Sequence, residues 1–169
     1  MKRIFVFMAI FMFVIMIAGC ATMPKIDRDL TITKMVYCSE EPEGFGKYVE
    51  KKDNVVAPSV SFWIYIEYTG LMEIEDFVNL SGSLNIRSIK GVSLYESKMF
   101  QKTFKSGEYI EGYNRALIGV LDKKGWISLR MVSGSYLQEY EWVITLTDGY
   151  SGKQAVESIW FKVANTVKV

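Results

Sequence analysis

The chain has 169 residues, of which 50% are hydrophobic, and it carries 20 basic and 19 acidic side chains. This length is typical of one domain, and a net charge of +1 gives the protein no electrostatic reason to bind nucleic acid. The sequence contains no histidine, which excludes the commonest general base and a leading ligand of transition metals.

The N-terminus has the features of an export signal. Lys2 and Arg3 provide a positive start, and an apolar run extends from Ile4 to Ala18. As a helix this run would span about 22 Å, less than the ~30 Å hydrocarbon core of a membrane. Its length and flanks therefore favour a signal peptide over a permanent membrane span.

The apolar run ends in Ile17-Ala18-Gly19-Cys20, which is a branched apolar residue, two small residues and a cysteine. This motif resembles the lipobox of bacterial lipoprotein precursors. The resemblance implies that residues 1–19 are removed by cleavage between Gly19 and Cys20, and that Cys20 carries a diacylglycerol and, in many bacteria, an N-acyl chain. Ala21 stands where an Asp would favour the inner membrane, so the resemblance implies an outer-membrane location if the source has one. An uncleaved signal anchor is the alternative.

Residues 20–29 are predicted to form a lipidated tether, and residues 30–169 a folded domain. Nine residues after Cys20 reach at most about 30 Å, so we expect the domain to lie close to the membrane. Cys38 is the only other cysteine, and it has no intramolecular partner if Cys20 carries lipid. We expect it to be a small buried side chain at a strand end, and an exposed, reactive or intermolecularly paired thiol is the alternative.

From Leu30 onward the sequence predicts short β-strands separated by turn residues. A polar loop is expected at 39–54 and one helical turn at 72–77, and the pattern between 98 and 121 is less clear. Six to eight strands of this kind predict an all-β fold, a single antiparallel β-sandwich. The predicted strands are 30–38, 60–68, 80–89 with a continuation at 91–95, 126–132, 140–147 and 156–163.

The last two predicted strands form the clearest hairpin, joined through Asp148-Gly149, where glycine is expected to accept a positive φ. This hairpin resembles the closing strands of immunoglobulin-like or fibronectin-like bacterial domains. The segments Phe45-Gly46-Lys47-Tyr48 and Tyr65-Ile66-Glu67-Tyr68 also resemble parts of uncharacterised secreted bacterial proteins, and that resemblance implies no activity.

No nucleophile elbow, phosphate loop or dinucleotide motif is present. Carboxylates cluster in two places, and paired carboxylates can hydrolyse glycosidic bonds when one of them is buried. We interpret both clusters as solvated surface acid, with a calcium site built from several loops as an alternative. The two clusters are Glu40, Glu41 and Glu43, and Glu73, Glu75 and Asp76.

The aromatic residues carry the most specific functional prediction. Trp63, Tyr65 and Trp160 lie on predicted strands whose opposite faces are also apolar. A strand in a sandwich buries one face fully, so we predict that these three side chains form an exposed platform for a sugar, peptide or protein. The alternative is a central strand covered by a loop.

These features together predict a non-enzymatic binding or scaffold module in the cell envelope, without a metal or cofactor. A glycan-active enzyme that uses loop carboxylates, and a carbohydrate-binding module that uses an aromatic face, are the alternatives.

Overall fold

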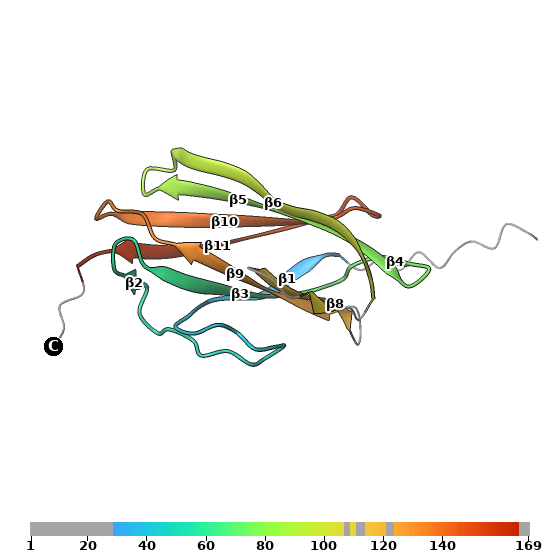
Figure 1. Ribbon diagram of the computed structural model, residues 1–169. Helices are drawn as coiled ribbons and strands as arrows, with labels where there is room; N and C mark the ends of the chain where they lie inside the picture. The colour runs from blue at the N-terminus through green and yellow to red at the C-terminus, as the bar shows by residue number, and fades with distance from the viewer. Residues whose placement is uncertain (1–28, 107–108, 111–113, 121–123, 166–169) are drawn as a thin grey trace, which may run out of the picture.

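The structure is a computed structural model that describes residues 29–106, 109–110, 114–120 and 124–165. All regular secondary structure in these residues is β (Figure 1). Among them, no helix is long and apolar enough to cross a membrane. The predicted signal peptide and Cys20 lie outside the described residues.

Two sheets pack face to face, so the predicted all-β sandwich is confirmed (Figure 1). In the first sheet the strand order is β1-β3-β9-β8-β7, and all neighbours are antiparallel. These strands are β1 (Thr31–Cys38), β3 (Ser61–Thr69), β9 (Lys124–Val132), β8 (Asn114–Val120) and β7 (Tyr109–Ile110).

The second sheet has the order β2-β11-β10-β5, with β6 on the far side of β5 and β4 beside the start of β5. Only the short β2–β11 pair in this described sheet is parallel. The strands are β2 (Val55–Val56), β11 (Gln154–Val163), β10 (Glu139–Asp148), β5 (Phe77–Ser88), β6 (Ser93–Lys105) and β4 (Glu73–Ile74).

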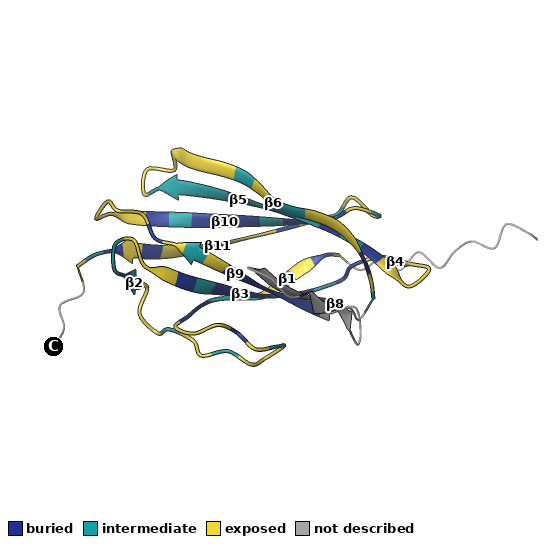
Figure 2. Ribbon diagram, in the orientation of Figure 1, coloured by how far each residue is buried: buried dark blue, intermediate teal, exposed yellow. Residues whose placement is uncertain are grey.

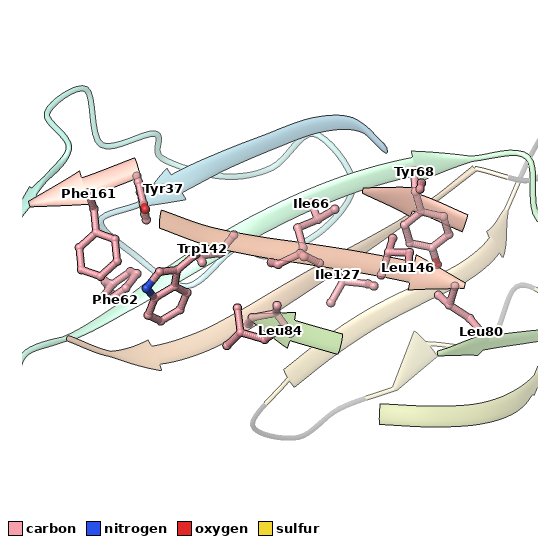
Figure 3. Close-up of a cluster of buried hydrophobic side chains, with 14 of the residues drawn as sticks. Tyr37, Phe62, Ile66, Tyr68, Leu80, Leu84, Ile127, Trp142, Leu146 and Phe161 are labelled. Atoms are coloured by element: carbon pink, nitrogen blue, oxygen red, sulfur yellow. The ribbon is translucent and has the colours of Figure 1, made fainter. Parts of the chain in front are cut away.

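Period-2 alternation places the core between the sheets, as the sequence predicts. The inward faces of β3 and β10 supply much of it, and Figure 3 shows their side chains meeting those of β5, β9 and β11. At one end the core is aromatic, where Phe62 packs against Tyr37 and Trp142 at centroid distances of 5.6 and 5.4 Å. The inward residues are Phe62, Ile64, Ile66 and Tyr68 on β3 and Trp142, Ile144 and Leu146 on β10.

The predicted helical turn at 72–77 is wrong. Residues Glu75 and Asp76 both have positive φ, at 50° and 65°, and they form the two-residue turn of a hairpin between β4 and β5. Two successive left-handed residues fit the right-handed twist of a hairpin. The structure also has more strands than predicted, because three two-residue strands join eight longer ones among the described residues.

The β10–β11 hairpin forms where predicted, but the reason given for its glycine is wrong. Gly152 has the positive φ of 72°. Gly149 is needed for close approach instead, since a Cβ there would lie 2.4 Å from the Asn79 side chain. The buried Asp148 carboxylate stabilises the turn by accepting hydrogen bonds from Tyr150 N and from Ser151 Oγ, at 3.0 and 2.8 Å.

The two ends of the sandwich differ in what they carry. β1 begins at the end where β10 turns into β11, and Asp29 forms a 2.9 Å ion pair with Lys153 there. At the other end the β5–β6 turn, the loop from β9 to β10 and the end of β11 lie together (Figure 1). Asp29, the first described residue, therefore lies at the end opposite this second group of loops.

Candidate binding groove

The structure separates the three aromatic residues that the sequence groups together. Tyr65 is fully buried, Trp63 is half-buried and Trp160 is 41% exposed. Trp63 and Tyr65 face outward from the first sheet, whereas Trp160 lies on the outer face of the second. The prediction of one exposed aromatic platform is therefore wrong, although Trp160 itself is exposed.

The loop at 39–54 causes this difference, because it folds over the outer face of the first sheet (Figure 1). Tyr48 from the loop stacks on Tyr65 at 4.4 Å between centroids, and Tyr65 stacks on Trp126 at 5.9 Å. The backbone N–H of Gly46 donates a 2.7 Å hydrogen bond to the Tyr65 hydroxyl, which donates to Glu67 Oε1 at 2.8 Å. The covered-strand alternative is thus correct for β3.

Cys38 lies beneath the same loop at the end of β1, fully buried beside Tyr65 and Trp126. Burial raises the pKa of its thiol to about 12, and the nearby Glu50 carboxylate adds to the shift. A thiol held so far from ionisation is a poor nucleophile at neutral pH. The prediction of a small buried side chain is confirmed, and the alternative of an exposed thiol is wrong.

The first acidic cluster is solvated, as predicted, and the second is partly so, because Glu73 is half-buried and accepts a 3.1 Å hydrogen bond from Ser106 Oγ. Glu40, Glu41 and Glu43 are exposed on the covering loop. The second cluster lies on the β4–β5 hairpin, where Glu75 and Asp76 are exposed. No three carboxylate or cysteine side chains in the described part of the chain gather into a metal site.

A hollow of about 450 Å³ lies at the end of the sandwich opposite Asp29. We call it the end groove. Its walls come from the two ends of the β5–β6 turn, from the last residue of β9, from the loop at 133–138 and from the inner faces of β10 and β11. Five of its lining residues are aromatic: Tyr95, Tyr136, Tyr140, Trp142 and Phe161.

The rim of the end groove is open and apolar. Tyr136 is 76% exposed, and Tyr95, Leu94 and Val132 are also exposed. The floor is fixed, because Tyr140 stacks on Phe161 at 5.4 Å and donates a 3.3 Å hydrogen bond to the carbonyl oxygen of Tyr136. No charged side chain lines the groove among the described residues. Exposed apolar surface of this kind is typical of interaction sites.

One buried donor at the base of the groove lacks a partner within the described structure. Trp142 is 2% exposed, and its Nε1 has no hydrogen-bond acceptor. Figure 3 shows the indole nitrogen at the ring edge next to Phe62 and Phe161, at the groove end of the core. Buried indole N–H groups usually find an acceptor, and this donor lies beneath the surface of the groove rather than in its opening.

No protein-family model matches the chain, and no curated protein matches it significantly in sequence. The end groove was missed by sequence reasoning because its lining comes from positions between Ile86 and Phe161. Tyr136 lies in a Ser-Gly-Ser-Tyr-Leu segment between two predicted strands, and an exposed Tyr-Leu pair in a short loop was the available signal.

Proposed function

We propose that this protein is a lipid-anchored module of the bacterial cell envelope that binds another envelope protein through the end groove and catalyses no reaction. The observation that carries the proposal is the open, aromatic end groove. The lipobox residues Ile17 to Cys20 support a lipid anchor on Cys20. Ala21, which stands where an Asp would favour the inner membrane, supports placement in the outer membrane if the source has one.

We further propose that the sandwich is immunoglobulin-like. The strand order β1-β3-β9-β8 facing β11-β10-β5-β6 is the order in which immunoglobulin-like domains arrange theirs. Tyr140 supports the same assignment, because it stands at the start of β10 and its hydroxyl bonds the backbone four residues upstream. Immunoglobulin-like domains often carry a tyrosine in this role at this corner.

The placement of the end groove suits a partner that reaches the domain from beyond the membrane surface. β10 runs from the groove to the tether end in 10 residues, which corresponds to about 30 Å. A domain tethered through Asp29 would thus carry the groove at its far end.

The lining chemistry favours a protein partner over a glycan. Most of the lining is aromatic or aliphatic, and its polar side-chain groups, apart from the buried Trp142 N–H, are three tyrosine hydroxyls and the Gln138 amide, with no charged group. Apolar or aromatic side chains of a partner fill such a hollow well. The glycan-active enzyme is less well supported, because the two acidic clusters line no part of the groove.

Site-specific photo-crosslinking in intact cells tests this function. A photoreactive phenylalanine analogue replaces Tyr136 in the groove, and a matched strain carries it at Tyr150 at the tether end. We expect one discrete adduct from position 136 that is absent from position 150. Equal or diffuse crosslinking from both positions would contradict the proposal.

A further inference from the structure

β6 forms one open edge of the second sheet. Nine of its 13 residues are exposed, and Figure 2 shows this edge coloured mainly as exposed. β6 pairs only with β5 in the described structure. An edge strand of this length presents unpaired backbone groups that a further strand can bind.

The hydrogen-bond pattern identifies which residues of β6 face the open edge. Ser106 N donates to the carbonyl oxygen of Asp76 at 2.6 Å, and the pairing from there to Gly82 and Phe100 is regular. Bonded and non-bonded pairs alternate in an antiparallel ladder. Lys102 and Phe104 therefore bond to β5, whereas Gln101 and Thr103 direct their backbone N–H and C=O groups away from it.

Among the residues that the structure describes, Gln101 and Thr103 form no turn, loop or capping backbone hydrogen bond. The start of the same strand enters the end groove, because Leu94 and Tyr95 are among its lining residues. The open edge and the groove are thus continuous along β6.

We propose that an extended segment of a partner protein adds to the second sheet along β6 and inserts an apolar side chain into the end groove. The inference rests on the proposed function and names its mode of binding. Strand addition combines affinity from main-chain hydrogen bonds with specificity from a side-chain pocket, and β6 with the groove provides both.

Charge selects the chemistry of this segment. β6 carries Lys98, Lys102 and Lys105 against Glu96, a net charge of +2 for the strand from three positive residues and one negative. Acidic residues in the incoming strand would lie beside Lys98 and Lys102 and be stabilised. A second copy of β6 would place two strands of like charge together, which disfavours self-association and selects an acidic partner.

The direction of the segment follows from the orientation of β6. β6 runs from the groove toward Lys105, and antiparallel pairing is slightly more stable than parallel pairing. An antiparallel segment therefore runs toward the groove and places its C-terminal residue there. A strand from Thr103 to Tyr95 covers about 30 Å, so about ten residues suffice.

The test uses the full-length protein in detergent micelles and a synthetic peptide of about ten residues. Glutamate alternates with valine or threonine in the peptide, and phenylalanine stands at its C-terminus. The key variants are Gln101→Pro and Thr103→Pro, because proline removes a donor that faces the open edge and takes no donor from the ladder to β5. Gln101→Ala and Thr103→Ala are the matched controls, since they remove the side chain and keep the N–H.

We expect the proline variants to weaken peptide binding at least tenfold and the alanine controls to change it less than twofold. In the wild type, the peptide should slow amide hydrogen exchange at Gln101 and Thr103 at least tenfold, with little change at Lys102, whose N–H already bonds to β5. The hydrogen-exchange measurement uses the wild-type protein, so its result does not depend on whether the proline variants fold.

Absence of peptide binding, or binding without added protection at Gln101 and Thr103, overturns strand addition. A discrete crosslink at Tyr136 together with unchanged exchange on β6 would leave the groove as the binding site and reject only the strand pairing. Binding of a matched peptide with lysine in place of glutamate at equal strength would contradict the assigned acidic chemistry.

Discussion

Removal of one hydroxyl group should loosen the loop at 39–54 without disturbing the core beneath it. The Tyr65 hydroxyl accepts the hydrogen bond of Gly46 N and donates to Glu67 Oε1. Tyr65→Phe deletes both bonds and keeps the ring between Tyr48 and Trp126. The change thus acts on the attachment of the loop rather than on packing.

The expected magnitude follows from the exposure of the groups left behind. A neutral hydrogen bond contributes about 1 kcal/mol net, and one to a charged acceptor contributes somewhat more. Gly46 is exposed and Glu67 is half-buried, so water can replace part of what is lost. We expect loop closure to weaken by about 1 to 2 kcal/mol, which corresponds to about a 5- to 30-fold rise in the open population.

Cys38 reports this opening, because its thiol is buried under the loop. In the wild type we expect slow labelling by a thiol reagent under native conditions and fast labelling in denaturant. Tyr65→Phe should accelerate native labelling by about 5- to 30-fold if local opening limits access. Tyr140→Phe is the matched control, since it deletes a tyrosine hydroxyl bond at the end groove. Unchanged labelling in Tyr65→Phe, or equal acceleration in both variants, would refute the role of the loop.

Four further predictions follow from the structure and the sequence. Burial raises the pKa of the Cys38 thiol to about 12 from an ordinary value of 9.0, so the unfolded chain loses this proton at a lower pH than the folded protein does. The free energy of unfolding of the wild type should therefore fall between about pH 9 and 12 more steeply than that of Cys38→Ala. Denaturant titrations at a series of pH values measure this difference. Gly70→Ala should destabilise the fold by more than about 2 kcal/mol, since the φ of Gly70 is +91° and a Cβ would lie 2.2 Å from the Asp29 carbonyl oxygen. Gly91→Ala should cost only about 1 kcal/mol, because Gly91 has a φ of +75° but open space around it. Cys20→Ser should abolish palmitate labelling and leave an unprocessed precursor. Trp160→Ala should lower the melting temperature less than Trp142→Ala, because Trp160 is 41% exposed and Trp142 is 2% exposed.

Each of these predictions has an outcome that would contradict it. Parallel pH profiles for wild type and Cys38→Ala would mean that the thiol ionises equally in both states. Equal melting temperatures for the two glycine variants would reject the close approach at Gly70. Equal labelling and processing of wild type and Cys20→Ser would reject the lipobox assignment, and a large loss of stability in Trp160→Ala would place that residue in the core.

The sequence predicted the strands whose alternation is unbroken. The sequences of β3 and β10 predict one buried face and one outer face for each strand, because period-2 alternation determines which side chains enter the core. β6 was recognised only at its start. Its register against β5 shifts at Leu94 and Met99, where two residues oppose one. Each extra residue reverses the alternation that follows it, so no single pattern runs along the strand.

The outer faces of the sheets were less predictable than the core. Whether Tyr65 is exposed depends on Tyr48 and Gly46, which come from a loop without periodicity. Trp160 has a similar strand environment in sequence, and no comparable loop among the described residues buries it. The end groove likewise depends on how separate loops meet at one end of the fold, and local sequence patterns carry no such information.

The central claim is that the end groove, and not the outer face of a sheet, binds the partner. The most direct measurement is the yield of the crosslinked adduct at position 136 in otherwise wild-type, Tyr95→Ala and Trp160→Ala backgrounds. Tyr95 lines the groove and is 55% exposed, whereas Trp160 is exposed on the outer face of the second sheet. We predict that Tyr95→Ala reduces the yield at least tenfold, as loss of an interface aromatic commonly does, and that Trp160→Ala leaves it unchanged. Loss of the adduct in Trp160→Ala with retention in Tyr95→Ala would contradict the account.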